Sequence, residues 1–157
     1  MEGTHRYMLK LDWTGSRQGP AVKYETYSRE YRIEIDGKPA LTGSSDPTFL
    51  GDPKLFNPEE MLLAALSSCH MLSYLALCVR SRIAVHSYVD DASGTMKEKA
   101  PHRMGLVDVL LRPRVTVATG TDLAKAKALH EKAHELCFIA NSVNFPVRHE
   151  AEVSEAC

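Results

Sequence analysis

The sequence predicts an α+β fold in which largely antiparallel sheets wrap around one long, central, apolar helix. Two observations lead to this prediction. Segments with the alternating pattern of strands come in consecutive runs, and only residues 57–80 and 122–136 have the pattern of a helix. Such segregated runs, rather than a strict alternation of strands and helices, are typical of α+β proteins. The 157 residues contain no internal repeat or linker, so a single domain over residues 1–157 is expected.

The first third of the chain is expected to form strands joined by turns. Apolar and polar residues alternate over residues 7–13 and again over residues 31–35, which is the spacing of a half-buried strand. The second run ends at Asp36-Gly37, a pair that is typical of a tight hairpin turn. Residues 42–56 are rich in Gly, Ser, Asp and Pro, and they predict a loop.

A long helix is expected to begin at Asn57 and to end near Arg80. The Asn57 side chain can accept a hydrogen bond from an exposed backbone N–H, and the proline and two glutamates that follow favour the first helical turn. Apolar residues occur on all sides of this helix, which is typical of a helix enclosed on most sides. Polar residues 67–70 interrupt the apolar run and charges flank it, so a buried helix is favoured over a membrane span.

The second half of the chain is expected to contain four strands and one further helix. Three strands are expected at residues 85–88, 94–97 and 106–117. A second helix is expected to start from a cap formed by Thr121 or Asp122 and to extend through Leu136. Residues 145–153 predict a last short strand.

The composition narrows the classes of protein to which the chain can belong. It contains 19 basic and 20 acidic residues and has a formal net charge of -1, so net positive charge does not draw it to nucleic acid. Its four cysteines are too few and too irregularly spaced for a secreted disulfide framework, and the first residues do not have the pattern expected of a signal peptide. We therefore expect a soluble cytoplasmic protein with free thiols. Cys78 is expected to pack as a small apolar residue, and Cys157 is expected to be frayed.

Cys69 and Cys137 stand out among these thiols. Cys69 lies in the polar patch of residues 67–70, inside a helix otherwise built from Leu, Ala and Met, and polar residues in such a helix need partners. Cys137 ends the second helix. His130 and His134 precede it at spacings of seven and three residues, which places all three side chains within a stripe about 60° wide.

Two other kinds of site compete for the same residues. Cys69, His70, His134 and Cys137 could supply a Cys2His2 set for zinc. However, neighbours 69 and 70 point about 100° apart on a helix, and the chain contains no CxxC or HExxH motif. The same divergence argues against a hydrolase that uses Cys69 and His70 as nucleophile and base, because adjacent helical residues do not face each other.

Two motifs point to a known family. Residues 57–70, NPEEMLLAALSSCH, resemble the NPEE-L-x-A-A-x-x-x-C helix of the OsmC/Ohr family, which comprises osmotically inducible protein C and the organic hydroperoxide resistance proteins. Residues 133–142, AHELCFIANS, are similar to the family's AH-x-x-C followed by a small polar run. The hydroperoxide resistance branch has Pro-Tyr-Ser after its second cysteine and an aromatic residue where His70 stands, so this chain lies outside the best characterised branches.

The resemblance implies a thiol peroxidase with the OsmC-like fold. Cys69 would be the peroxidatic residue that attacks the peroxide, and Cys137 the resolving residue that forms a disulfide with it. Glu59 matches the family's glutamate ten residues before the first cysteine, and it would orient an arginine from the N-terminal region. That arginine would stabilise the thiolate and hydrogen-bond the peroxide. Arg29 is favoured for this role by its distance along the sequence to the Asp36-Gly37 turn and to Cys69, whereas Arg17 fits the family's loop by local pattern.

The resemblance also implies partners and excludes bound cofactors. It implies a homodimer with active sites at the interface, a hydroperoxide substrate, a dithiol reductant, and no haem, flavin or metal. The apolar residues around Cys69 favour an organic over an inorganic peroxide. A second function stays open beside the enzyme: a non-catalytic member of the family that binds a metal or small ligand through its Cys/His cluster.

Overall fold

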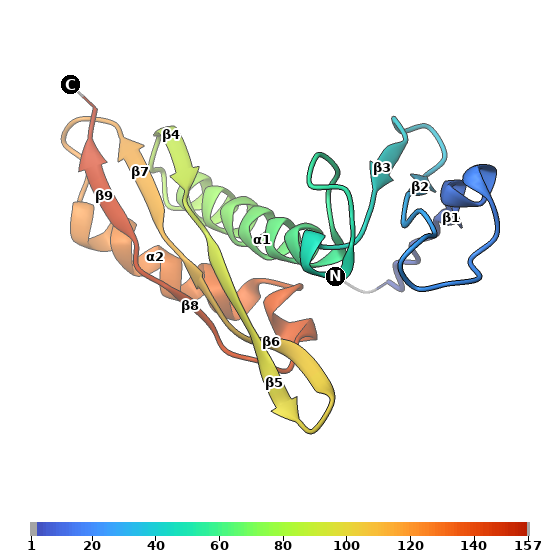
Figure 1. Cartoon of the computed structure of the whole chain (residues 1–157). Coiled ribbons are helices and arrows are strands. Elements are labelled where there is room, and N and C mark those ends of the chain that lie inside the picture. The colour runs from blue at the N-terminus through green and yellow to red at the C-terminus, as the bar shows by residue number, and fades with distance from the viewer. Residues whose placement is uncertain (1–2, 157) are drawn as a thin grey trace. The chain divides into compact units, whose positions relative to one another are not determined.

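The computed structural model describes residues 3–156, and its elements are labelled in Figure 1. The chain divides into two compact units, residues 1–61 and residues 62–157, and each is described by itself. The single domain over residues 1–157 stays a prediction. The two main helices and the mixed sheets confirm the α+β class.

The first unit contains one antiparallel sheet in the order β1-β2-β3. Its strands are β1 (Lys10–Asp12), β2 (Tyr31–Glu34) and β3 (Leu41–Gly43), and two short 3-10 helices, η1 (Thr14–Gln18) and η2 (Pro47–Phe49), accompany them. A turn at Asp36-Gly37 joins β2 to β3, with Gly37 at a φ of 71°. This confirms the turn that the Asp-Gly pair predicted. β1 is shorter than the expected strand over residues 7–13, and β3 occupies the start of the expected loop.

α1 (Pro58–Arg80) begins where the sequence predicts. The Glu60 N–H donates to Asn57 Oδ1 over 2.8 Å, and the Asn57 N–H donates to Glu60 Oε2 over 3.1 Å. These reciprocal bonds satisfy two backbone donors at the helix start. By length and apolar composition α1 resembles a membrane span, a property that the core helices of soluble proteins share.

Only one stripe of α1 is fully buried. Its members are spaced four residues apart: Leu66, His70, Tyr74 and Cys78. On other faces, Leu72 is 62% exposed and Val79 is 74% exposed. The expectation that the helix is enclosed on most sides is therefore wrong for this single chain, because the elements packed on α1 cover one stripe.

The second unit holds two three-stranded sheets, in the orders β4-β7-β9 and β5-β6-β8. Their strands are β4 (Val85–Asp90), β5 (Ser93–Ala100), β6 (Arg103–Leu111), β7 (Pro113–Val117), β8 (Val147–His149) and β9 (Glu152–Glu155). Pairings are antiparallel except for β6 with β8 and β7 with β9, which are parallel.

Two expected strands are each split in the structure. The strand expected over residues 106–117 divides at Arg112, whose N–H donates to Asp90 Oδ1 over 2.7 Å instead of joining a ladder. The strand expected over residues 145–153 also divides, because the chain leaves β6 and joins β7 between His149 and Glu152. Each strand therefore contributes to two sheets, which an alternating sequence pattern does not reveal.

α2 (Leu123–Leu136) lies along β9 (Figure 1). It begins as predicted, because Asp122 accepts a hydrogen bond from the Lys125 N–H over 2.9 Å. The Tyr74 hydroxyl on α1 donates to the Ala126 carbonyl on α2 over 3.1 Å. Apolar residues of α1, α2, β4, β7 and β9 form one core cluster around Tyr74, and those near β6 and β8 form another around Leu66. The first helix is thus fixed against the second where both carry cysteines and histidines. A third 3-10 helix, η3 (Ala140–Ser142), follows α2.

Candidate functional site

The structure brings Cys69 and Cys137 together within the second unit. Cys69 lies on α1 and is half-buried, whereas Cys137 caps the C-terminus of α2 and is 1% exposed. The Cys69 side chain lies close enough to Cys137 to raise the pKa of its thiol, and both thiols are free. Two thiols in this arrangement can form a disulfide once one of them is oxidised.

Cys137 is held as a neutral thiol. Burial above all, and to a smaller extent the neighbouring Cys69 side chain, raises its pKa to about 11 against the opposing effect of the Ala140 N–H. That N–H donates to Cys137 Sγ over 3.5 Å. Cys78, in contrast, is fully buried beside Tyr74, as expected of a packing residue. Cys157 lies outside the described residues.

Four histidines gather between α1, α2 and β8, and we call His70, His130, His134 and His149 the histidine cluster. His70 Nε2 lies 3.0 Å from His130 Nδ1, and the two rings stack with centroids 5.3 Å apart. The His149 ring centroid lies 5.4 Å from that of His70 and 6.1 Å from that of His134. The sequence pattern singled out three of these residues and missed His149, which reaches them from a strand remote in sequence.

The central pair of this cluster is neutral at physiological pH. Burial is the largest cause and the neighbouring imidazoles are the next. Together they lower the pKa of His70 to about 4 and that of His130 to about 3. Neutral imidazoles suit metal ions, but no group of three or more His, Cys, Asp and Glu within residues 3–156 is arranged to hold one. The Cys2His2 zinc set considered from the sequence therefore finds no support in the described part of the chain.

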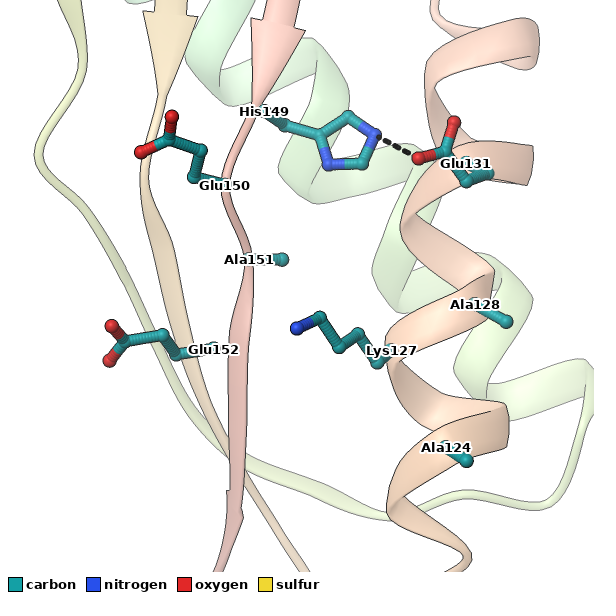
Figure 2. Close-up of a pocket in the computed structure, with 8 residues that line it drawn as sticks. All are labelled: Ala124, Lys127, Ala128, Glu131, His149, Glu150, Ala151 and Glu152. Carbon is teal, nitrogen blue, oxygen red and sulfur yellow. Dashed lines mark ion pairs between the residues drawn. The ribbon is translucent and has the colours of Figure 1, made fainter.

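A groove opens beside the histidine cluster, between α2 and the β8–β9 segment (Figure 2). It has a volume of about 690 Å³. At one end His149 Nε2 lies 3.4 Å from Glu131 Oε1, and Lys127 extends from α2 toward the strand. Glu150 and Glu152 point away from the helix (Figure 2). Small residues form much of the remaining wall: Ala124, Ala128 and Ala151.

Arg29, in the first unit, is held in a fixed position. Its Nη1 donates to the Tyr27 carbonyl over 2.7 Å, and its Nη2 donates to the Tyr24 carbonyl. Its guanidinium carbon lies 4.8 Å from the Tyr24 ring centroid and 4.0 Å from that of Tyr27. Arg17 differs: its side chain is 75% exposed and lies 3.9 Å from Asp12 Oδ2.

Arg29 lines a pocket of about 490 Å³ in the first unit, which we call the Trp13 pocket. Its lining comprises Trp13, Ala21, Tyr27, Arg29, Tyr31, Ser44, Ser45 and Pro58. Glu59 follows Pro58 at the start of α1. Burial, and to a smaller extent the negative charge of Glu59, raises the pKa of Tyr31. In the described part of the chain Glu59 forms no ion pair with Arg29.

Comparisons with known proteins identify the family. Residues 51–152 match the family described as OsmC-like protein. An OsmC-like protein of unknown function from Vibrio cholerae is 32% identical, with a TM-score of 0.86 over 95% of this chain and 100% of that one. The uncharacterized protein YmaD of Bacillus subtilis is 25% identical over 96% of this chain and 94% of its own length.

A more distant structure has the same fold. An organic hydroperoxide resistance protein from Elizabethkingia anophelis is 19% identical, with a TM-score of 0.68 over 99% of this chain and 100% of that one. At this identity the likeness concerns the fold alone. The two motifs at Cys69 and Cys137 and the match over residues 51–152 lead to one conclusion: the chain belongs to the family of OsmC-like proteins.

Proposed function

We propose that the protein is a cysteine-based peroxidase that reduces organic hydroperoxides in the cytoplasm. Cys69 is the peroxidatic residue and Cys137 the resolving residue. The observation that carries the proposal is the proximity of these two free thiols, one half-buried and one buried. Family membership adds support, since relatives of the same fold include proteins described as organic hydroperoxide resistance proteins.

The reaction proceeds in two steps. The Cys69 thiolate attacks one peroxide oxygen, so that an S–O bond forms, the O–O bond breaks and the other oxygen leaves as an alcohol after taking up a proton. Cys69 is thereby oxidised to a sulfenic acid. The Cys137 thiol then attacks this sulfur, an S–S bond forms, and the hydroxyl group leaves with the thiol proton as water. A dithiol reductant restores both thiols by two exchange steps.

Arg29 and Glu59 are proposed to assist the first step. The Arg29 guanidinium stabilises the thiolate and donates hydrogen bonds to the peroxide, and Glu59 orients it. The fixed position of Arg29 on the Tyr27 carbonyl and ring supports this assignment over Arg17, which lies in solvent. In the isolated chain the guanidinium binds backbone carbonyls, so the proposal requires it to reach the peroxide when substrate is bound.

The proposed enzyme is a homodimer with active sites at its interface. The support lies in α1, where Leu72 and Val79 are 62% and 74% exposed in the single chain. Large apolar side chains at this exposure gain free energy when a partner covers them. Sedimentation of the purified chain tests this assembly, and a monomer at micromolar concentration contradicts it.

Thiol counting tests the chemistry. The reduced protein is treated anaerobically with one equivalent of cumene hydroperoxide, and free thiols are counted before and after. We expect the loss of two thiols and a digest in which Cys69 is linked to Cys137. Cys78 serves as the matched control, because it lies nine residues, about 13.5 Å, along the same helix, beyond the reach of a disulfide. Unchanged thiols would contradict the proposal.

A further inference from the structure

The two thiols of the pair differ in how easily another molecule can reach them. Cys69 on α1 is half-buried, whereas Cys137 at the end of α2 is 1% exposed. A thiolate that reduces a disulfide attacks one of its two sulfur atoms, and access helps to decide which one. In the disulfide proposed for these residues, an incoming thiolate therefore reaches the Cys69 sulfur more readily than the Cys137 sulfur.

Attack at Cys69 makes Cys137 the leaving group, and the surroundings of Cys137 oppose a negative charge. Cys137 is buried and caps the C-terminal end of α2, which is the negative end of the helix dipole. Burial above all raises the pKa of its thiol to about 11. A thiol with a high pKa is a poor leaving group, so the exchange benefits from any group that stabilises the departing sulfur.

The turn that follows α2 provides such a group. The Ala140 N–H donates to Cys137 Sγ over 3.5 Å. Together with the Ile139 N–H, it lowers the pKa of the thiol against the effect of burial. Both donors belong to the backbone, so neither depends on pH. A hydrogen bond to sulfur strengthens as the sulfur gains negative charge, and the donor is therefore most effective while Cys137 leaves.

The turn is held in a position where the Ala140 N–H faces the sulfur. The Asn141 N–H donates to the Cys137 carbonyl over 3.0 Å. The Ser142 N–H donates to the Ile139 carbonyl, also over 3.0 Å. Ile139 and Ala140 pack against the core cluster near β6 and β8. The donor is thus in place before the exchange begins and does not have to be recruited.

We propose that a dithiol reductant attacks the Cys69 sulfur of the oxidised protein, and that the Ala140 N–H is a positioning group that stabilises Cys137 as it leaves. The inference rests on the proposed function for the disulfide itself. A bond forms between one reductant sulfur and Cys69 Sγ, the bond between Cys69 and Cys137 breaks, and Cys137 Sγ leaves with the electron pair and takes a proton from water. The second reductant thiolate then attacks the first reductant sulfur, which closes a cyclic disulfide and releases Cys69 as a thiolate.

A trapping experiment identifies the sulfur that is attacked. The full-length protein is oxidised with diamide, which links neighbouring thiols without a peroxide, and is then exposed to 2-mercaptoethanol. Because this reductant has a single thiol, the product of the first exchange can be trapped with N-ethylmaleimide. Mass spectrometry of a digest should find mercaptoethanol on Cys69 and the maleimide on Cys137. The reverse labelling, or no link between the two cysteines after diamide, would overturn the inference.

The role of the Ala140 N–H is tested by replacing that group alone. Residues 1–136 with a C-terminal thioester are ligated to a synthetic peptide of residues 137–157, and the junction is native because Cys137 begins the peptide. L-Lactic acid in place of Ala140 replaces the N–H with an ester oxygen. 2,3-Dihydroxypropanoic acid in place of Ser142 is the matched control. It removes the hydrogen bond from Ser142 to the Ile139 carbonyl, which the first ester also weakens.

We expect the ester at Ala140 to slow the reduction of the diamide-formed disulfide by dithiothreitol by about threefold to tenfold, because a donor to a developing negative charge is lost. The equilibrium constant of the same reaction should stay unchanged, since the product carries Cys137 as a neutral thiol. A merely structural effect that moved the Cys137 side chain would change this constant, because it would alter how close the two thiols lie. The ester at Ser142 should change neither value.

Three results would overturn the role of Ala140: no slowing, equal slowing with both esters, or slowing with a matching shift in the equilibrium constant. Thiol counting with cumene hydroperoxide separates these outcomes from the fate of the proposed function. Attack at Cys69 together with thiols that resist the peroxide would leave the exchange mechanism standing and remove the peroxidase. Loss of two thiols to the peroxide with mercaptoethanol trapped on Cys137 would do the reverse.

Discussion

The thiol pair and the Trp13 pocket differ in how the chain builds them. The thiol pair forms where two regular helices meet, with Cys69 on α1 and Cys137 at the end of α2. The Trp13 pocket is built from loops, short strands and backbone carbonyls in the first unit. Helical spacing leaves a signature in the sequence, whereas a pocket held by carbonyl groups does not.

The largest effect is expected at the thiol pair. Cys69→Ser removes the nucleophile, and serine at neutral pH does not reduce a peroxide, so the rate of peroxide reduction should fall to background. Stopped-flow consumption of cumene hydroperoxide measures this rate. Cys78→Ser on the same helix should retain the rate of the unaltered protein, and equal losses in both variants would indicate damage to α1 rather than loss of a reacting group.

The second largest effect is expected at one of the two candidate arginines of the first unit, Arg29. Arg29→Ala removes a guanidinium that lines the Trp13 pocket, and we expect the rate of peroxide reduction to fall by about 100-fold, the cost of losing one donor to a developing negative charge. Arg17→Ala should change the rate by less than about twofold, because its side chain is largely in solvent. The opposite ranking would transfer the catalytic role to Arg17.

Gly43→Ala tests how closely the Tyr31 ring packs on β3, where Tyr31 pairs with Gly43. The added methyl group would lie 2.4 Å from the ring, so the ring must move. We expect a loss of about 1 to 3 kcal/mol in the free energy of unfolding, measured by urea unfolding. Gly3→Ala is the control, since nothing lies within 4 Å of its added Cβ. An unaltered free energy of unfolding would show that the ring can move away without cost and is not held by this packing.

The smallest effect concerns pH and the histidine cluster. The folded-state pKa values of His70 and His130 are lowered to about 4 and about 3, whereas an unfolded histidine titrates near 6.5. The unfolded state therefore binds protons first, and stability should fall as the pH falls below about 6.5. Between pH 7 and pH 5.5 we expect a loss of about 1 kcal/mol per imidazole.

Urea unfolding at several pH values measures this loss. His130→Gln should give a shallower dependence on pH than the unaltered protein, even if it is less stable at neutral pH. His86→Gln, at an exposed position, should keep the original slope. Parallel curves for all three proteins would mean that the cluster is already protonated or already open in the folded state.

The difference between the helical thiol pair and the loop-built pocket also explains which features could be predicted from the sequence. The starts of α1 and α2 follow from Asn57 and Asp122, whose side chains accept the expected backbone hydrogen bonds. The resemblance of two motifs to the OsmC/Ohr family predicted that Cys69 and Cys137 lie together, as the effect of Cys69 on the Cys137 thiol indicates. His149 could not be placed, because only the parallel pairing of β8 with β6 brings it to the helices. The position of the Tyr31 ring carried no signal either, since it depends on the empty space at Gly43 across the strand pair.

The last two strands of the second unit, β8 and β9, determine when its two sheets can be completed during synthesis. Residues 147–149 complete one sheet and residues 152–155 complete the other, in both cases by parallel pairing with strands formed much earlier in the chain. Both sheets therefore lack their third strand until the ribosome has released these residues. Pairings between remote segments also form slowly. A nascent chain stalled before residue 147 would expose two unfinished sheet edges at once, the kind of surface that chaperones shield from aggregation.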